Sequence, residues 1–270
     1  MSDALAALPP IREQLARHGL LARKSFGQHF LLDLNLTGRI ARAAGDLATG
    51  TCIEIGPGPG GLTRALLAAG AAAVIAIEKD TRFRPLLDEI GAACPGRLSV
   101  IEDDALKTDT ALLGSAPRRI IANLPYNIST PLLIGWLRNI AAFESLTLMF
   151  QKEVAVRIAS GPGTSDYGRL SVMTQWLCEA DILFDIPARA FTPPPKVDSA
   201  VIRLTPRPDL PDRETFARVE GIVARAFNQR RKMLRSSLKG CDFEAAGIDP
   251  TRRAEELSVA DFLRLAGVSA

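Results

Sequence analysis

Short apolar runs rich in β-branched residues alternate with longer amphipathic segments along most of the chain. The apolar runs at residues 51–55, 74–78, 98–102, 119–123 and 145–151 predict strands, whereas residues 62–70, 81–93, 130–140 and 152–160 carry apolar side chains at helical spacing. Strands that alternate with helices in this way are typical of βαβ units. The pattern therefore predicts a parallel sheet that is covered by helices on both faces.

The pattern changes toward the C-terminus. After a helix predicted at residues 169–180, strands at 181–186 and 199–205 are joined by a proline-rich segment too short for a parallel crossover, so one strand should run antiparallel. Residues 206–211, PRPDLP, predict a linker, and helices are expected at 213–229, 230–240 and 258–267, the last capped by Ser258. We expect an α/β domain at residues 1–205 and a small all-helical domain at residues 206–270.

Composition narrows the class of protein. The chain has 270 residues, of which 47% are hydrophobic, and it contains no uncharged apolar run of membrane-spanning length. Its N-terminus lacks the basic start and apolar centre of a signal peptide, which predicts a cytoplasmic protein without a membrane partner. Four widely spaced cysteines and two histidines form no metal-ligand pattern, so we expect reduced thiols and no metal.

Basic residues gather in one part of the helical segment. Residues 225–239 contain six of them and no acidic residue, within a chain whose net charge is only +3. A surface of a single sign favours a polyanionic partner such as RNA, although a merely solubilising surface has the same composition. The six residues are Arg225, Arg230, Arg231, Lys232, Arg235 and Lys239.

A glycine-rich loop follows the first predicted strand. The segment IEIGPGPGGLT contains Gly56-x-Gly58-x-x-Gly61, and glycines there permit a tight turn and close approach of a ligand to the start of the next helix. Glu78 ends the second strand, where an acid binds ribose hydroxyls. This pattern is typical both of nicotinamide dinucleotide sites and of S-adenosylmethionine sites, and it does not separate them.

Two neighbouring features favour S-adenosylmethionine. Pro57 and Pro59 remove backbone N–H groups that a pyrophosphate would need. The third strand ends in EDDAL, which places Asp103 or Asp104 beside the same crevice, where a carboxylate accepts from an adenine amine and repels a second phosphate. We interpret the loop as a methyl-donor site, with glycines that serve only packing as the alternative.

The fourth predicted strand ends in Asn123-Leu124-Pro125-Tyr126, at the same edge of the sheet. An exocyclic amine of a base is a poor nucleophile, because its lone pair is delocalised into the ring. The amide oxygen of Asn123 and a carbonyl near Leu124 would accept its two N–H hydrogens. Pro125 would fix the turn, and the ring of Tyr126 would stack on the base. The alternative is a helix-capping Asn beside a core Tyr.

Several longer motifs resemble one family. The segments KSFGQHFLLD, EIGPGPGGLT, IEKD, EDDAL, NLPYNIST, FTPPPKVDSAV and FNQRRKMLRSSL resemble, in order, motifs of the ribosomal RNA small-subunit adenine N6,N6-dimethyltransferases, almost end to end. The resemblance implies a Rossmann-like methyltransferase sheet with a helical RNA-binding domain. It also implies S-adenosyl-L-methionine as the cofactor and S-adenosyl-L-homocysteine as its product.

The resemblance further implies roles for single residues. His29, Leu31, Gly56, Glu78, Asp104 and Asn123 would contact the donor. The catalytic set would be Asn123, Leu124, Pro125, Tyr126 and Phe191, with Phe191 closing over the target adenine opposite Tyr126, and Arg230, Arg231, Lys232 and Arg235 would bind RNA. His29 stands where many members have Asn, and Ser236 replaces an Asn that is common in the basic helix.

The implied substrate is a pair of adjacent adenosines in the 3′-terminal hairpin of 16S rRNA, each methylated twice within a late pre-30S subunit by a monomeric enzyme. A large-subunit rRNA adenine methyltransferase that confers macrolide resistance is the nearest alternative, and the basic segment and the FTPPPKVDSAV loop disfavour it. The intact Asn-Leu-Pro-Tyr motif disfavours a non-catalytic RNA-binding assembly factor. An NAD-dependent oxidoreductase is disfavoured because the sequence shows no hydride-transfer pair near the glycine loop.

Overall fold

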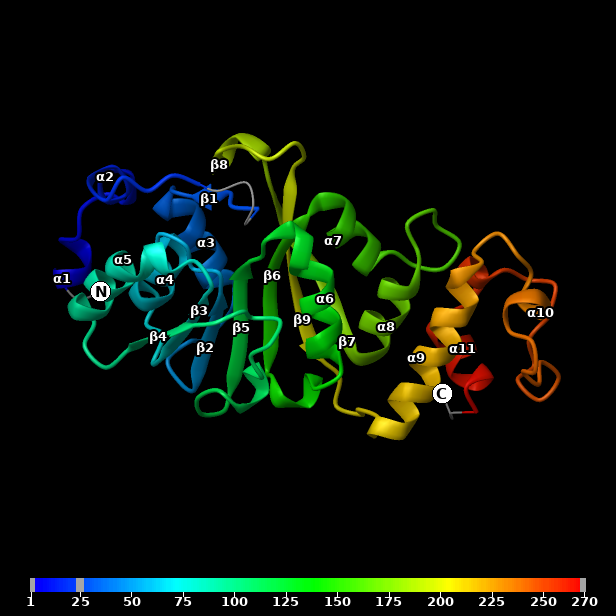
Figure 1. The fold of residues 1–270 in the computed structure, drawn as a ribbon. Helices are drawn as coiled ribbons and strands as arrows, with labels where there is room; N and C mark the ends of the chain where they lie inside the picture. Colours follow the sequence, from blue (N-terminus) through cyan, green and yellow to red (C-terminus); the bar gives the residue numbers. More distant parts are fainter. Residues whose placement is uncertain (1–2, 23–26, 268–270) are drawn as a thin grey trace.

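The structure is a computed structural model that describes residues 3–22 and 27–267. Figure 1 shows an α/β domain on the N-terminal side and a group of helices on the C-terminal side. The strands are β1 (Phe30–Leu31), β2 (Thr51–Ile55), β3 (Val74–Glu78), β4 (Leu98–Glu102), β5 (Arg118–Asn123), β6 (Ser145–Gln151), β7 (Cys178–Ile186), β8 (Phe191–Thr192) and β9 (Ser199–Pro206). The α-helices are α1 (Asp3–Ala6), α2 (Ile11–Arg17), α3 (Leu34–Ala43), α4 (Gly61–Ala68), α5 (Arg84–Ala93), α6 (Tyr126–Leu137), α7 (Lys152–Ala159), α8 (Arg169–Leu177), α9 (Arg213–Asn228), α10 (Leu234–Ser237) and α11 (Val259–Leu265).

A seven-stranded sheet forms the centre of the α/β domain, in the order β4-β3-β2-β5-β6-β9-β7. Neighbouring strands pair parallel from β4 through β6, whereas β9 runs antiparallel to both β6 and β7. This confirms the predicted Rossmann-like sheet with one antiparallel strand. β1 and β8 form a separate two-stranded ribbon, in which Phe30 lies opposite Thr192 and Leu31 opposite Phe191 (Figure 1).

Both faces of the sheet are buried. Alternate residues of a strand point to opposite faces, so Ile53 and Ile120 join a core cluster with α6, α7 and α8, while Cys52 and Ile121 join a cluster with α3, α4 and α5. Every residue of β2 is buried, and so are most residues of β5 and β6. This burial explains why these strands read as unbroken apolar runs rather than as alternating patterns.

The strand order reverses between β2 and β5. From β2 the chain builds β3 and β4 on one side, and it later places β5 and β6 on the other. The carboxyl ends of two strands at such a reversal leave a crevice in which ligands bind. β2 ends just before Gly56 and β5 ends at Asn123. The fold therefore brings the glycine loop and the Asn-Leu-Pro-Tyr motif to one place.

Two predicted helices have wrong boundaries. The helix expected at residues 130–140 begins at Tyr126 and ends at Leu137, because Pro125 already has the extended conformation of an N-cap. The helix expected at residues 169–180 ends at Leu177, since Cys178 pairs with Pro206 of β9. Pairing along the whole of β9 overrides the helical spacing of those residues.

The helix predicted at residues 230–240 is reduced to the four residues of α10. The amide of Leu234 donates to the carbonyl of Arg252 at 2.8 Å, and the amide of Arg235 donates to the carbonyl of Pro250 at 3.0 Å. These two hydrogen bonds hold the segment against residues 250–252. The amides of Leu234 and Arg235 are therefore not available for the hydrogen bonds within the segment that a regular helix would require.

Aromatic rings join the C-terminal helices to the α/β domain. Phe216 of α9 stacks on Trp176 of α8 with ring centroids 6.0 Å apart, and Tyr167 meets Phe227 edge to face at 6.1 Å. Buried residues of α9 and α11 belong to the same core cluster as the sheet residues beneath α6. The C-terminal helices therefore share a continuous core with the α/β domain.

Charged groups reinforce this junction. Glu220 of α9 accepts from Arg138 and from Arg169, each at 3.0 Å.

The domain boundary predicted between residues 205 and 206 falls at the end of the sheet, because the last strand ends at Pro206 and α9 begins at Arg213. Among the helices of the described residues, none has both the length and the apolar character that a membrane span requires.

A buried acid lies beneath the glycine loop. Glu54 of β2 is 1% exposed, and its Oε2 accepts a 2.7 Å hydrogen bond from the hydroxyl of Thr63 in α4. Burial, opposed by the Thr63 bond and reinforced by the nearby Glu78, raises the pKa of Glu54 to about 8. The carboxyl group is therefore mostly protonated at neutral pH, and it links β2 to α4 as a neutral partner.

The Glu54→Gln variant tests this protonation state. A carboxyl group whose pKa is higher in the folded than in the unfolded protein loses stabilising free energy as the pH rises, here between 4.5 and about 8. The glutamine amide can still accept from Thr63 but does not titrate. We expect the variant to gain stability relative to the wild type as the pH rises, by no more than about 1.4 kcal/mol per unit of pKa difference. Denaturant unfolding at about pH 5 and about pH 9 measures this difference, and a constant difference would contradict the buried neutral acid.

Candidate active site

The glycine loop adopts the tight turn that its sequence predicts. Gly56, Gly58 and Gly60 have φ angles of 65°, 53° and 83°, a region that other residues adopt rarely. Gly61 begins α4, and a Cβ atom there would lie 2.6 Å from the carbonyl oxygen of Leu31. The loop therefore bends sharply and also permits β1 to lie against the start of the helix.

Glu78 lies at the end of β3 beside this loop. It is 7% exposed, its Oε2 accepts from the amide of Gly58 at 2.9 Å, and its Oε1 accepts from the amide of Asp80 at 2.7 Å. Burial raises the pKa of Glu78, and the two backbone bonds oppose that shift. Each carboxyl oxygen accepts one backbone bond and keeps a second acceptor position, which suits the two hydroxyls of a ribose.

Asp103 and Asp104 both line the cleft at the end of β4. Asp104 accepts from Nζ of Lys79 at 2.8 Å and from the amide of Leu106 at 3.0 Å, and the Lys79 bond is the main reason its pKa lies below the usual range. The carboxylate of Asp103 accepts from the Thr108 hydroxyl at 2.9 Å. Asp104 is therefore an ionised acceptor at the position where an adenine amine is expected.

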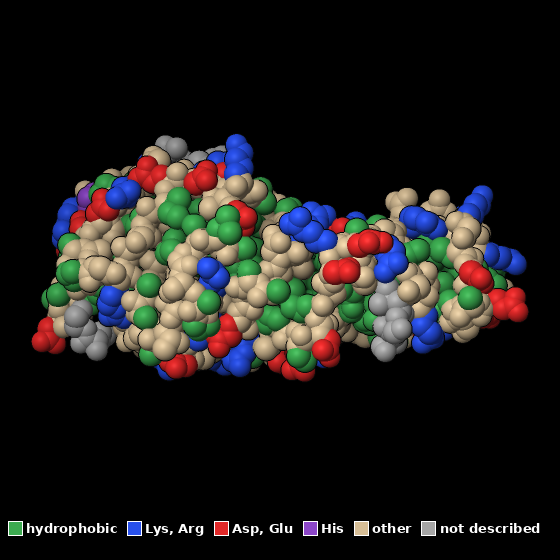
Figure 2. Space-filling model, turned by 90° about the horizontal axis from the view of Figure 1, so that it is seen from below, with side chains coloured by type: hydrophobic (Ala, Val, Ile, Leu, Met, Phe, Trp, Pro, Cys, Tyr) green, Lys and Arg blue, Asp and Glu red, His purple; other side chains and the backbone are tan. Residues whose placement is uncertain are grey.

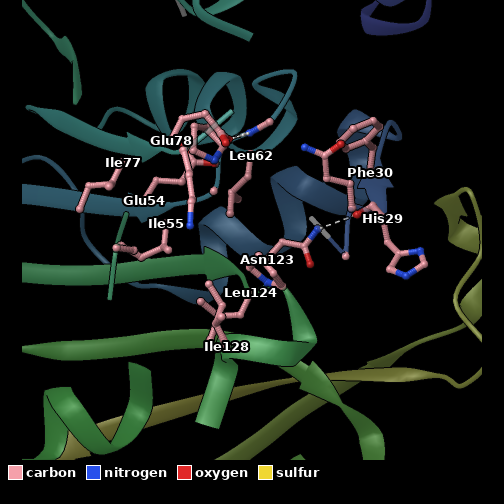
Figure 3. Close-up of a pocket in the computed structure, with 18 of the residues that line it drawn as sticks. His29, Phe30, Glu54, Ile55, Leu62, Ile77, Glu78, Asn123, Leu124 and Ile128 are labelled. Carbon is pink, nitrogen blue, oxygen red and sulfur yellow. Dashed lines mark hydrogen bonds between the residues drawn. The ribbon is translucent and has the colours of Figure 1, made fainter. Parts of the chain in front are cut away.

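Asn123 has a defined orientation at the end of β5. Its Nδ2 donates to the carbonyl of His29 at 3.1 Å, as Figure 3 shows by a dashed line. Among the described residues no donor reaches Oδ1 of Asn123, so this oxygen is available in the cleft. Leu124 is 1% exposed and belongs to the core cluster, and both Leu124 and Pro125 line the cleft just before α6 begins.

Tyr126 and His29 lie together at the rim of the cleft. Their rings stack with centroids 5.7 Å apart and an interplanar angle of 27°. The Tyr126 hydroxyl shares a 2.6 Å hydrogen bond with the Ser199 hydroxyl, and burial raises the pKa of Tyr126. The His29 ring points away from Glu54 and Glu78 in Figure 3, so His29 faces the donor side through its backbone.

Phe191 does not line the cleft. It is 2% exposed, pairs with Leu31 between β8 and β1, and belongs to the core cluster that contains α3, α4 and α5. Leu31 does line the cleft, as the resemblance implies. The structure thus brings together every expected donor-side residue and the Asn-Leu-Pro-Tyr motif, but not the second aromatic ring. Lys24, Ser25 and Phe26 of the N-terminal motif lie outside the described residues.

The four expected RNA-binding residues are not equivalent. All are exposed, but Arg230 forms a 2.6 Å ion pair with Glu255 and donates to the carbonyl of Ser165. Arg231, Lys232 and Arg235 have no ion-pair partner among the described residues. On the face of the molecule that Figure 2 shows, basic and acidic side chains are intermixed. Of the four residues, Arg231, Lys232 and Arg235 are therefore the ones whose charges are available to a polyanion.

The sequence reading missed several residues that shape the cleft. Glu54 is one of them, although an acid two residues before the first glycine at the end of an apolar strand was a visible signal. Gln28 is another, and its Nε2 donates to Asp80 at 2.9 Å. The apolar wall comes from Ile55, Leu62, Ile77, Leu106 and Ile128. Only the tertiary arrangement brings these side chains together.

The charges of the cleft decide between the two nucleotide classes. Besides the neutral Glu54, three carboxyl groups line it, those of Glu78, Asp103 and Asp104, whereas Lys79 is the one lysine or arginine among the described lining residues. Such a lining repels a pyrophosphate and accommodates a nucleoside that carries a positive sulfonium. The residues therefore fit S-adenosylmethionine. The described residues contain no group of three or more His, Cys, Asp or Glu placed to hold a metal ion.

Comparison with known proteins agrees with this geometry. Residues 19–270 match the family described as ribosomal RNA adenine dimethylase. Ribosomal RNA small subunit methyltransferase A of Rhodospirillum rubrum is 64% identical over 264 residues, which cover 96% of this chain and 92% of that protein. The protein of the same name from Paramagnetospirillum magneticum is 61% identical over 267 residues, covering 97% and 95%.

Two solved structures resemble most of the chain. A dimethyladenosine transferase from Plasmodium falciparum superposes with a TM-score of 0.74 at 27% identity, over 89% of this chain and 99% of that one. The 23S rRNA methyltransferase ErmE superposes with a TM-score of 0.68 at 29% identity, over 88% and 98%. With the family match covering nearly all of its length, the chain belongs to the ribosomal RNA adenine dimethylases, methyltransferases that use S-adenosylmethionine.

Proposed function

We propose that this enzyme dimethylates N6 of two adjacent adenosines in the 3′-terminal hairpin of 16S rRNA, in a late pre-30S particle assembling in the cytoplasm. The names of its relatives support the small-subunit target. The observation that carries the chemistry is the orientation of Asn123, whose Nδ2 is held by the His29 carbonyl. That bond leaves an amide oxygen in the cleft as an acceptor for an exocyclic amine.

The donor would be held at the strand ends on both sides of the reversal. Glu78 would accept the ribose hydroxyls, and Asp104 would accept the adenine amine between apolar side chains such as Leu106. The bend at Gly56 would bring backbone close to the methionine part, and the backbone of His29 and Leu31 would cover it. When bound, S-adenosylmethionine supplies an electrophilic methyl group on a positive sulfur.

Asn123 and Leu124 would act on the nucleophile. Two N–H bonds directed at the Asn123 amide oxygen and the Leu124 carbonyl favour a pyramidal amine, whose lone pair is then free to attack. The lone pair would bond to the methyl carbon that the donor supplies, the electrons of the broken carbon–sulfur bond would stay on sulfur, and the proton of the methylated amine would pass to water. Because the step depends on positioning and electrostatics, it requires no strong general base.

Tyr126 would hold the target base by stacking. A base on an aromatic ring gains about 1 to 3 kcal/mol, and the Ser199 bond fixes the hydroxyl end of this ring. The resemblance assigns a second stacking ring to Phe191, but that ring is 2% exposed in the core. We therefore assign Phe191 to the pairing of β8 with β1 and keep Tyr126 as the stacking ring.

The target RNA can be identified directly. Undermethylated 30S subunits and, separately, 50S subunits are incubated with labelled S-adenosylmethionine, and the modified bases are mapped. We expect label at N6 of two adjacent adenosines near the 3′ end of 16S rRNA and none in 50S subunits. Label in 23S rRNA alone would replace this proposal with the function that the name of ErmE describes.

Asn123→Ala removes the acceptor oxygen from the cleft. Losing one oriented polar group in such a site lowers kcat by about a hundredfold to a thousandfold, whereas donor affinity should change by only a few-fold. Methyl transfer and calorimetric titration of the donor measure the two effects. Asn139→Ala, at an exposed asparagine outside the cleft, should match the wild type in both. Wild-type turnover in Asn123→Ala would refute the role.

Reversing Arg231 and Arg235 to Glu tests the RNA surface. Both side chains are exposed and have no ion-pair partner among the described residues, so their charges are available to phosphates. We expect weaker binding to 30S particles and a log–log salt slope reduced by about 1 for each lost phosphate contact. The control reverses Arg213 and Arg218, at the other end of α9, and should leave the slope unchanged. A loss of affinity that does not depend on salt would contradict a phosphate contact.

A further inference from the structure

The side chain of His29 makes two contacts that donor binding does not require. Its ring stacks on Tyr126 at 5.7 Å, and its Nδ1 lies 2.8 Å from the carbonyl oxygen of Pro193. The backbone carbonyl of His29 separately accepts from Asn123. The ring also points away from the donor-side acids Glu54 and Glu78 (Figure 3). The side chain therefore faces the acceptor side of the cleft, while the backbone serves the donor side.

The bond to Pro193 fixes the protonation pattern of the ring. A carbonyl oxygen can only accept, so Nδ1 must carry the proton. Pro193 begins the rim loop, residues 193–198, between β8 and β9, and the first three residues of this loop are prolines without a backbone N–H. Most of the rim loop is exposed to solvent. With so few donors of its own, the loop depends on bonds from outside, and His29 supplies one at its first residue.

The stack on His29 fixes the plane of Tyr126. The Ser199 bond holds only the hydroxyl end, and a ring held at that end alone could still rotate about its long axis. A stacking platform is useful only when its plane is set before the base arrives, because ordering it later would cost binding free energy. His29 contacts both the ring that receives the base and the loop at the entrance.

We propose that the His29 side chain is a positioning residue for the acceptor base. It sets the ring plane of Tyr126 and fastens the rim loop at Pro193. The inference rests on the proposed function, since it requires an adenine to stack on Tyr126. It assigns the side chain a role in substrate positioning that is separate from the donor contact of the same residue's backbone.

Three variants separate the two contacts. His29→Asn keeps a donor near the place of Nδ1 and loses the ring, His29→Phe keeps a ring and loses the donor, and His29→Ala loses both. Each keeps the backbone carbonyl that accepts from Asn123. With methylation of undermethylated 30S subunits as the assay, we expect kcat/KM to fall about tenfold in His29→Ala and about threefold in each single-contact variant. The affinity for S-adenosylmethionine, measured by calorimetry, should stay within about twofold.

Hydrogen exchange of the free protein tests the fastening without any RNA. The amides of Lys152 and Ala188, which donate to the carbonyl and the carboxylate of Asp198 in the rim loop at 2.9 Å each, should exchange several-fold faster in His29→Ala and His29→Phe, and at the wild-type rate in His29→Asn. His18→Ala is the control, because the other histidine of the chain pairs with Glu89 away from the cleft. Its exchange and turnover should match the wild type.

The possible results separate this inference from the proposed function. Unchanged exchange at the amides of Lys152 and Ala188 in His29→Ala would overturn the fastening, even if the wild type proved inactive on 30S subunits. A kcat/KM of His29→Ala within twofold of the wild type, or a parallel loss of donor affinity, would overturn the positioning role. Failure of the wild type to methylate 30S subunits, with faster exchange in His29→Ala, would refute the proposed target and leave the fastening supported.

Discussion

The hydrogen bond from Asn123 to the His29 carbonyl determines which end of the Asn123 amide faces the cleft. If that acceptor were missing, the amide could turn its N–H groups toward the target amine, and a donor would then face a donor. The two residues are 94 positions apart in the chain. The chemistry at the end of β5 therefore depends on the N-terminal segment lying across the reversal of strand order.

The glycines of the loop leave room for that N-terminal segment as well as for a ligand. A Cβ at Gly58 would come within 3.3 Å of the Phe30 ring, and a Cβ at Gly61 would come within 2.6 Å of the Leu31 carbonyl oxygen. Phe30 also packs edge to face on Phe83 at 5.5 Å. Close packing of β1 against the glycine loop is thus one reason for glycine here, in addition to the room that a donor would need.

The site residues at the strand ends were predictable from the sequence. In a parallel α/β sheet, ligands bind at the carboxyl ends of the strands, and this rule requires only the order of strands and helices. Glu78 and Asn123 follow from that rule alone. The burial of Phe191 does not, since it depends on β8 pairing with β1, two strands of two residues each that are too short to carry a pattern. The ion pair of Arg230 also depends on a residue distant in sequence, Glu255. Residues 230–240 form less helix than predicted because they make hydrogen bonds with residues 250–252. The spacing of residue types along the chain predicts none of these long-range contacts.

The strands whose ends carry the acids of the cleft, β2 to β4, and the basic segment around α10 lie in different parts of the molecule (Figure 1). An acidic cleft favours a cationic donor and disfavours the phosphates on both sides of a target adenosine. Under the proposed function, the free energy that brings RNA to the cleft would therefore come from elsewhere, from the basic residues of the C-terminal helices and from stacking on Tyr126. Phosphate contacts weaken with salt, whereas stacking and the proposed acceptor bonds of Asn123 and Leu124 scarcely would. Recognition and methyl transfer should then differ in salt dependence, because the proposal places them on surfaces of opposite charge.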